Sequence, residues 1–164
     1  MRLFSTVVLV SAITASTIFA NPLRDEAIGS GLEAIPQSYA QLLEFINDKN
    51  DPITDAKVEL GKKLYFDPRL SKSGIISCNT CHNLALGGVD GVDAAIGHKW
   101  TKNPSHLNSP TVYNSVFNQV QFWDGRSPHL ADQAQGPIQA GPEMAAPKDL
   151  VEARINSIPQ YVAE

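Results

Sequence analysis

The chain has 164 residues, a formal net charge of −4 and 43% hydrophobic residues, which is enough for one globular core. The acidic balance argues against a nucleic-acid-binding protein, which needs basic patches or stripes. Aromatic residues make up only 7% of the chain, and most of its 11 glycines and 11 prolines follow residue 66. This composition indicates loops wrapped around a cofactor more than a regular sheet.

The N-terminus has the layout of a secretory signal peptide. Arg2 gives a short basic start, Leu3 to Phe19 form an apolar run diluted by Ser and Thr, and Ala20 precedes a polar stretch. We therefore expect residues 1–20 to be a signal peptide, residues 21–164 to be one mature domain, and the protein to reach the periplasm. The alternative is a membrane anchor. The run is short and Ser/Thr-rich for a spanning helix, so no membrane span is expected after cleavage.

In the first half of the mature chain, helix signals alternate with proline breaks. Residues 21–36 indicate an irregular lead-in, and residues 38–47 predict a short amphipathic helix. Thr54 is a candidate N-cap for a second helix. That helix ends at Asp67, because a residue before proline avoids the helical region. A turn is expected over residues 71–74.

The second half predicts further short helices between loops. Residues 84–97 are rich in Gly, Val and Asp and are expected to form a loop. The helices are expected over 110–117 with Ser109 as N-cap, over 130–135 with Gly136-Pro137 as the stop, and from Pro147 with Leu150, Val151 and Ile155 facing inward. Strand signals are weak throughout, so the expected fold is mainly α, with short helices and long loops.

The motif Cys78-x-x-Cys81-His82 has the spacing of a covalent c-type haem attachment site. Two cysteines on one helical turn can both form thioethers with one haem, and the adjacent histidine then gives the iron a fifth ligand. A bare Cys-x-x-Cys also occurs in thioredoxin-like dithiols and as half of a zinc site. A thioredoxin-like dithiol is preceded by a strand, and a zinc site needs a second pair of ligands. Neither is visible, since the chain has only 2 cysteines.

From about residue 35 to its end, the chain resembles the bacterial dihaem cytochrome c peroxidases. The resemblance rests on a series of motifs in the family's order. They are Leu60-Gly-Lys-Lys-Leu-Tyr-Phe-Asp-Pro-Arg-Leu-Ser71, Ser77-Cys-Asn-Thr-Cys-His-Asn83, Gly87-Gly-Val-Asp90, Ile96-Gly-His98, Asn108-Ser-Pro-Thr111, Gln121-Phe-Trp-Asp-Gly-Arg126, Gly136-Pro-Ile138 and Glu143-Met144. Such a series is far more specific than Cys-x-x-Cys-His alone.

The resemblance implies a cytochrome c-like, peroxide-reducing haem domain that carries one covalently bound haem c. It implies hydrogen peroxide as substrate, a small c-type cytochrome or cupredoxin as electron donor, and a homodimer for the full-length family form. In the family a second domain follows, with its own Cys-x-x-Cys-His motif. This sequence contains no second motif, so we expect a C-terminally truncated fragment; the alternative is a natural single-haem protein.

Four residues receive roles at the haem from the resemblance. His82 is the proximal ligand, and His98, on its Gly-rich loop, matches the family's displaceable sixth ligand. While both histidines are bound, peroxide has no open position, so activity would require His98 to swing away. Glu143 matches the distal acid/base, whose pKa apolar neighbours can raise, and Gln133 matches a glutamine that binds peroxide. Taken alone, His98, Gln133 and Glu143 would be ordinary surface residues.

Further matches lie toward the second domain of the family. Trp123 matches a tryptophan between the two haems that assists electron transfer, and Asn108 matches one ligand of a calcium site at the domain interface. One amide oxygen cannot hold calcium tightly, because the ion wants six to eight oxygens. The sequence departs from the family at 140–142, where Ala-Gly-Pro replaces the common Asn-Pro-Val. His106 and His129 have no equivalent context and are expected at the surface.

Three other functions remain open. Met144 lies about sixty residues after His82, a separation that suits a monohaem His/Met electron carrier. A related dihaem enzyme that oxidises a protein substrate, such as those that mature methylamine dehydrogenase, would share these motifs. The chain could also be a folded haem fragment that is inactive without the second haem.

Overall fold

The structure is a computed structural model that describes residues 21–105 and 107–163. The expected signal peptide at 1–20 and the expected surface residue His106 lie outside the described residues. By its internal contacts the chain divides into two compact units, with the division after Leu42.

The described part of the first unit contains one complete helix, α1 (Pro22–Gly29). Asn21 caps it, because its side-chain oxygen accepts a hydrogen bond from the Leu23 amide at 3.1 Å, and Pro22 fits the first helical position. The expectation of an irregular lead-in over 21–36 is therefore wrong for its first half. The following helix, α2 (Tyr39–Ile46), spans the division and confirms the helix predicted over 38–47.

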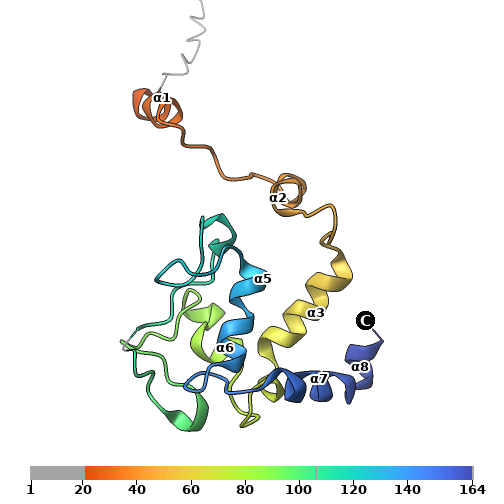
Figure 1. Ribbon diagram of the computed structural model, residues 1–164. Coiled ribbons are helices and arrows are strands. Elements are labelled where there is room, and N and C mark those ends of the chain that lie inside the picture. Colours follow the sequence, from red (N-terminus) through yellow and green to blue (C-terminus); the bar gives the residue numbers. More distant parts are fainter. Residues whose placement is uncertain (1–20, 106, 164) are drawn as a thin grey trace, which may run out of the picture. The chain divides into compact units, whose positions relative to one another are not determined.

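The second unit begins with a long helix followed by short ones. Helix α3 (Asp55–Phe66) starts at the predicted cap, where the Thr54 hydroxyl accepts from the Lys57 amide at 3.2 Å. The 3-10 helix η1 (Pro68–Leu70) follows directly. A turn then leads to α4 (Cys78–Cys81), which packs against α3. Figure 1 shows α3, α7 and α8 on one side of the α5–α6 segment and the loops of residues 84–125 on the other.

Loops with single helical turns connect α4 to α5. They contain η2 (Leu84–Leu86), η3 (His98–Trp100) and η4 (Ser115–Phe117), together with isolated β-bridges. The prediction of a helix over 110–117 is wrong except for this last turn. Residues 111–112 bind the 87–88 loop instead: the Thr111 hydroxyl donates to the Gly87 carbonyl at 2.6 Å, and the Val112 amide to the Gly88 carbonyl at 3.3 Å.

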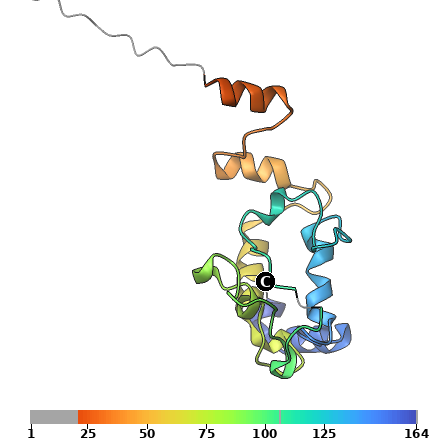
Figure 2. The ribbon, with the colours of Figure 1, turned by 90° about the vertical axis from the view of Figure 1, so that its left-hand side faces the viewer.

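The predicted helix over 130–135 continues past its expected stop. Helix α5 (Leu130–Gln133) runs into α6 (Gln135–Gln139), and Figures 1 and 2 show the two as one column. Pro137 lies in the first turn of α6, where no helical partner for its missing N–H is needed. Gly136 packs closely on Phe122, since a Cβ there would lie 2.9 Å from Cζ of Phe122 and would displace that ring.

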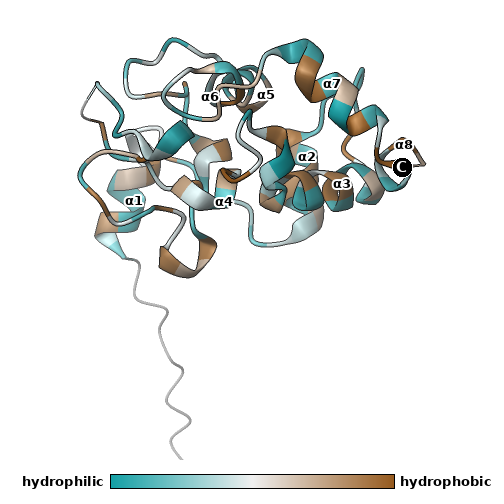
Figure 3. Cartoon of the chain, turned by 90° about the horizontal axis from the view of Figure 1, so that it is seen from below, coloured by the Kyte–Doolittle hydropathy of each residue, from teal (hydrophilic) through white to brown (hydrophobic). Residues whose placement is uncertain are grey.

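A small apolar core connects these elements. Leu70, Ile76 and Met144 are buried, and partly buried residues pack around them: Leu64, Ile138, Val151 and Ile155. The last two come from α7 (Lys148–Asn156), which confirms the helix predicted after Pro147. Figure 3 shows brown and teal residues alternating along α7, as expected for a helix with one face on the core. Helix α8 (Pro159–Val162) follows it.

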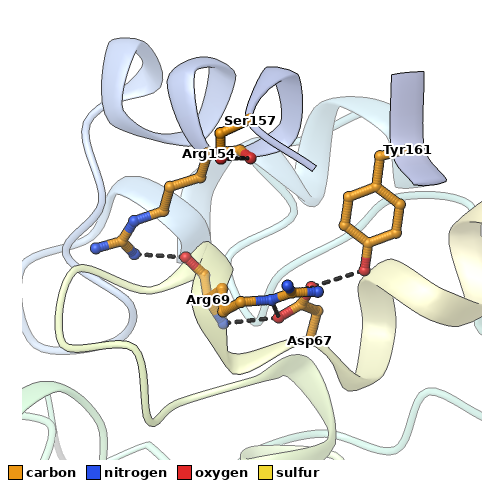
Figure 4. A network of polar contacts seen from close by, with 5 residues as sticks. All are labelled: Asp67, Arg69, Arg154, Ser157 and Tyr161. Atoms are coloured by element: carbon orange, nitrogen blue, oxygen red, sulfur yellow. Dashed lines mark hydrogen bonds and ion pairs between the residues drawn. The ribbon is translucent and has the colours of Figure 1, made fainter. Parts of the chain in front are cut away.

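A polar network fastens α7 and α8 to η1 (Figure 4). The Asp67 carboxylate accepts hydrogen bonds from the Arg69 guanidinium at 2.6–3.0 Å and from the Tyr161 hydroxyl at 2.6 Å. Arg69 and Tyr161 together hold the pKa of Asp67 down to about 2, chiefly through the Arg69 hydrogen bond. The Arg154 guanidinium donates to the carbonyls of Arg69 and Ser71. We call Asp67, Arg69, Arg154 and Tyr161 the latch.

The described residues confirm a mainly α fold with short helices and long loops, and they contain no named strand. None of the described helices is both long and apolar enough to cross a membrane.

Candidate haem site

Helix α4 places both cysteines of the motif on one turn. Its N-cap is Ser77, whose amide donates to the Thr80 hydroxyl at 3.0 Å. Burial raises the pKa of the Cys78 thiol, and it raises that of Cys81 to about 11. A dithiol oxidoreductase instead lowers the pKa of its attacking cysteine. The environment of α4 therefore does not match that of a thioredoxin-like dithiol.

His82 follows α4 and has a defined tautomer. Its Nδ1 lies 3.0 Å from the Pro110 carbonyl, which can only accept a hydrogen bond. The ring proton must therefore be on Nδ1, so the lone pair is on Nε2. This is the arrangement of a metal-binding imidazole whose second nitrogen is held by a backbone carbonyl.

The loop of His98 is fastened to the loop of Glu143 through the backbone. The His98 amide donates to the Glu143 carbonyl at 2.7 Å. Gly97 is buried against the backbone of Pro142 and Glu143, and a Cβ on it would lie 2.1 Å from the Pro142 carbonyl oxygen. Only glycine permits this approach. The contact joins the sequence-predicted sixth ligand and the sequence-predicted acid/base, although 45 residues separate them in the chain.

The His98 loop also reaches the cysteine motif. The Cys81 thiol lies 3.8 Å from the Ile96 carbonyl oxygen, so the loop is anchored next to α4. The imidazole of His98 is less well held, because its Nδ1 is buried without a hydrogen-bond partner among the described residues. Such an unpaired buried nitrogen is rare in proteins and asks for an explanation. The loop then turns through Lys99 and Trp100, both at φ 57°, which is uncommon for residues other than glycine.

The Glu143 carboxyl lies in a partly desolvated position. Burial raises its pKa above the usual value, and the positive charge of Arg126 opposes that rise. The direction agrees with the expectation of a carboxyl tuned for proton transfer. Gln133 is half-buried at the last residue of α5, and its side chain makes no hydrogen bond within the described part of the chain.

Trp123 and Asn108 are brought together at the surface. The indole of Trp123 is 62% exposed and donates to the Asn108 carbonyl at 3.1 Å. The resemblance named these two residues separately, and the structure places them side by side. His129 is exposed, as expected, and its Nδ1 caps α5 by accepting from the Asp132 amide at 3.2 Å. Its surface position thus includes a structural role.

Met144 is 3% exposed and packs in the apolar core with Leu70 and Ile76. A methionine that ligates iron would instead face the haem. Its place in the core accounts for this residue without a ligand role, which weakens the case for a His/Met electron carrier.

Two residues at the site were not identified from the sequence. The sequence predicts a helix start at Pro110, and it gives Tyr65 no role at the site beyond its place in a shared motif. In the structure the carbonyl of Pro110 binds the His82 ring, and the Tyr65 hydroxyl donates to the His82 carbonyl. Both residues lie within motifs that carry the resemblance, and that was the only available signal.

The residues present fit a covalently attached haem. The site supplies a thiol pair on one turn, an imidazole with its lone pair on Nε2, and a second imidazole with an unpaired buried nitrogen. Over the described residues there is no cluster of three or more His, Cys, Asp or Glu side chains that could hold a metal ion by themselves. The donor set therefore fits a haem iron better than a zinc ion.

Comparisons with known proteins identify the family of the chain. The family model described as "Di-haem cytochrome c peroxidase" matches residues 55–164. Cytochrome c551 peroxidase of Pseudomonas aeruginosa is 49% identical over 87% of this chain, and the methylamine utilization protein MauG of Methylorubrum extorquens is 45% identical over 83%. The chain spans 39% and 38% of these two relatives.

A solved structure of a MauG-like protein associated with microbial copper homeostasis shares the fold. Its TM-score is 0.64 at 27% identity, and the match covers 71% of this chain and 34% of that one. The motif, the site and the matches lead to one conclusion: the chain belongs to the di-haem cytochrome c peroxidase family.

Proposed function

We propose that the chain is the peroxidatic haem domain of a periplasmic cytochrome c peroxidase, which reduces hydrogen peroxide to water. Each peroxide takes up two electrons and two protons and gives two water molecules. The electrons would come from a small c-type cytochrome or a cupredoxin. The proposal is supported by relatives named as cytochrome c peroxidases in Pseudomonas aeruginosa and Escherichia coli, at 49% and 48% identity. It concerns the activity of a whole enzyme, of which this chain matches only part.

Cys78 and Cys81 would hold haem c through thioether bonds, and His82 would bind the iron through Nε2. Haem iron supplies the redox chemistry that cleaves the peroxide O–O bond. The Pro110 carbonyl, at 3.0 Å from Nδ1, increases the basicity of His82 and so favours that cleavage.

His98 would be the removable sixth ligand. The observation that carries the proposal is the hydrogen bond of 2.7 Å between the His98 amide and the Glu143 carbonyl. It keeps a potential ligand and a potential acid/base on neighbouring backbone, on a loop that also contacts Cys81. Movement of His98 would then open space for peroxide beside Glu143.

Glu143 would act as the acid/base. Its carboxylate would accept a proton from the oxygen of peroxide nearest the iron and deliver it to the leaving oxygen. Burial favours the protonated form, which this delivery requires. Gln133 would hydrogen-bond the bound peroxide, for which its amide has no competing partner in the described residues.

The exposed Trp123 and the neighbouring Asn108 would serve the full-length form. Trp123 would assist electron transfer from a second haem domain, and Asn108 would give one oxygen to a calcium ion shared with that domain. Calcium should bind this chain weakly, because most of its six to eight oxygens would come from elsewhere. We propose a homodimer for the full-length protein.

A second candidate function is oxidation of a protein substrate. The 45% identity to a protein named MauG favours it, since that match covers 83% of this chain. The two functions differ in substrate and share the haem site.

The experiment uses the haem-loaded protein, with His98→Gly and Glu143→Gln as variants. We expect His98→Gly to give a high-spin, five-coordinate spectrum and to bind peroxide without prior reduction. Glu143→Gln should keep the haem and lose about 10²- to 10⁴-fold in peroxide turnover with a reduced cytochrome c. Gln135→Glu, an exposed change on α6, is the control. An unchanged six-coordinate spectrum in His98→Gly, or full turnover in Glu143→Gln, would contradict the assigned roles.

A further inference from the structure

His82 is held at three separate atoms. Its amide donates to the Cys78 carbonyl at 2.9 Å, which belongs to the hydrogen bonding of α4. Its ring Nδ1 donates to the Pro110 carbonyl at 3.0 Å. Its own carbonyl accepts a hydrogen bond from the Tyr65 hydroxyl. The third contact is the only one of these made by a side chain from another helix.

The carbonyl of His82 is a group that α4 does not hold. His82 is the C-cap of that helix, at φ −124° and ψ 58°, and carbonyls at a helix end have no partner inside the helix. This carbonyl is bonded to the same Cα that carries the imidazole. A donor that holds the carbonyl therefore restricts movement of that Cα and, through it, of the ring.

Tyr65 is a well-placed donor. It lies in the last turn of α3, which is capped at Thr54 and packs against α4. Its ring is half-buried and meets the Phe66 ring edge-on, at 5.2 Å between centroids.

We propose that Tyr65 is the positioning residue for the imidazole of His82: by holding the His82 carbonyl, it keeps Nδ1 on the Pro110 carbonyl and Nε2 aimed at the iron. The inference rests on the proposed role of His82 as proximal ligand. Loss of the Tyr65 hydroxyl would loosen the hydrogen bond to Pro110. A weaker bond makes the imidazole a poorer electron donor, which stabilises the ferric state less.

The test compares Tyr65→Phe with Tyr113→Phe in the haem-loaded chain. Tyr113 is a matched control, because its hydroxyl also donates to a backbone carbonyl of this segment, that of Leu84, two residues beyond His82. Both variants lose one hydroxyl and keep the ring. The readouts are the midpoint potential of the haem and the iron–histidine stretching frequency, measured in ferrous protein that also carries His98→Gly.

We expect Tyr65→Phe to raise the midpoint potential and to lower the stretching frequency, while Tyr113→Phe leaves both unchanged. Equal behaviour of the two variants in potential and frequency would overturn the proposal, even if both lower the unfolding temperature. A second variant, Tyr65→3-fluorotyrosine, keeps the shape of the side chain and makes the hydroxyl a stronger donor. It should shift the potential in the opposite direction, and a shift of the same sign as for Tyr65→Phe, or none, would also overturn the proposal.

The proposed function is checked first and separately. A chain that attaches no haem at Cys78 and Cys81, or that shows an unchanged spectrum in His98→Gly, refutes the haem roles before Tyr65 is altered. A failure confined to the Tyr65 variants refutes only the positioning role.

Discussion

The two histidines of the candidate site are held in opposite ways. His82 is fixed through its ring, its amide and its carbonyl, by partners from three different segments. His98 is fixed through its backbone, by a 2.7 Å hydrogen bond to the Glu143 carbonyl, while Nδ1 of its ring has no partner among the described residues. A permanent ligand needs a fixed ring, whereas a removable ligand needs a fixed loop and a ring that can leave.

The backbone around the two histidines differs as well: His82 follows a packed helix, whereas His98 begins a single strained turn. His82 follows α4, which packs on α3, and the buried Ile76 lies just before that helix. His98 begins a single 3-10 turn with two consecutive residues in the left-handed region, Lys99 and Trp100. Such residues cost about 1 kcal/mol or more each and persist only where the surroundings hold them. The His98 loop is therefore held through its backbone, whereas Nδ1 of the His98 ring has no partner among the described residues.

The largest effect is expected from Gly97→Ala on the His98 side. The new Cβ would lie 2.1 Å from the Pro142 carbonyl oxygen and 2.6 Å from that of Glu143, and both are backbone atoms that cannot rotate away. The two loops must separate, so the hydrogen bond from the His98 amide is lost. We expect the free energy of unfolding to fall by about 3 kcal/mol, measured by chemical denaturation.

Gly141→Ala is the matched control for this change. Gly141 lies in the loop that Gly97 contacts, and a Cβ there would meet nothing within 4 Å. Its free energy of unfolding should stay within about 1 kcal/mol of the unchanged protein. Equal losses in the two variants would show that the contact between the loops is not tight.

A smaller effect is expected from Asp67→Asn in the latch. The Asp67 carboxylate is 6% exposed, and its pKa of about 2 lies below the usual value near 3.8 because of Arg69 and Tyr161. A depressed pKa stabilises the fold above the unfolded-state pKa and loses that contribution as the pH falls through the folded-state pKa. Asp67→Asn should therefore cost about 1–2 kcal/mol at pH 7, since Arg69 is partly screened by water.

The difference between Asp67→Asn and the unchanged protein should shrink as the pH is lowered from about 4 to about 2, in unfolding curves taken at each pH. Asp124→Asn is the control, because Asp124 pairs with Arg126 in an exposed ion pair and should have a much smaller effect. A gap that is constant with pH would mean that Asp67 is not charged in the latch.

Local signals in the sequence were sufficient to predict the helices next to His82. The cap at Thr54 and the stop at Asp67 depend on neighbours in the chain, and the structure confirms both. The spacing of the cysteine motif likewise agrees with the single helical turn that carries both cysteines. The helix expected from Pro110 failed for a tertiary reason. Thr111 and Val112 bond to the 87–88 loop, and the Pro110 carbonyl binds His82, so local capping was overridden.

The contact between the His98 loop and the Glu143 loop could not be predicted from a sequence pattern. The resemblance named His98 and Glu143, but their contact depends on a glycine packed against backbone 45 residues away. Likewise, Tyr65 has a helical position that predicts packing, and its bond to His82 follows only from how α3 lies on α4. Contacts that join distant loops have no periodicity or spacing from which they could be predicted.

The smallest effect on the free energy of unfolding is expected from Gly61→Ala, which stabilises helix α3 near His82. Gly61 is an exposed residue inside α3, a Cβ there would meet nothing within 4 Å, and alanine is the better helix former. We expect the free energy of unfolding to rise by about 0.5–1 kcal/mol, with the haem spectrum and the ligation by His98 unchanged. If stiffening α3 also altered the His98 ligation, the two sides would be coupled through Tyr65 and α4, and the contrast between a fixed and a removable histidine would not hold.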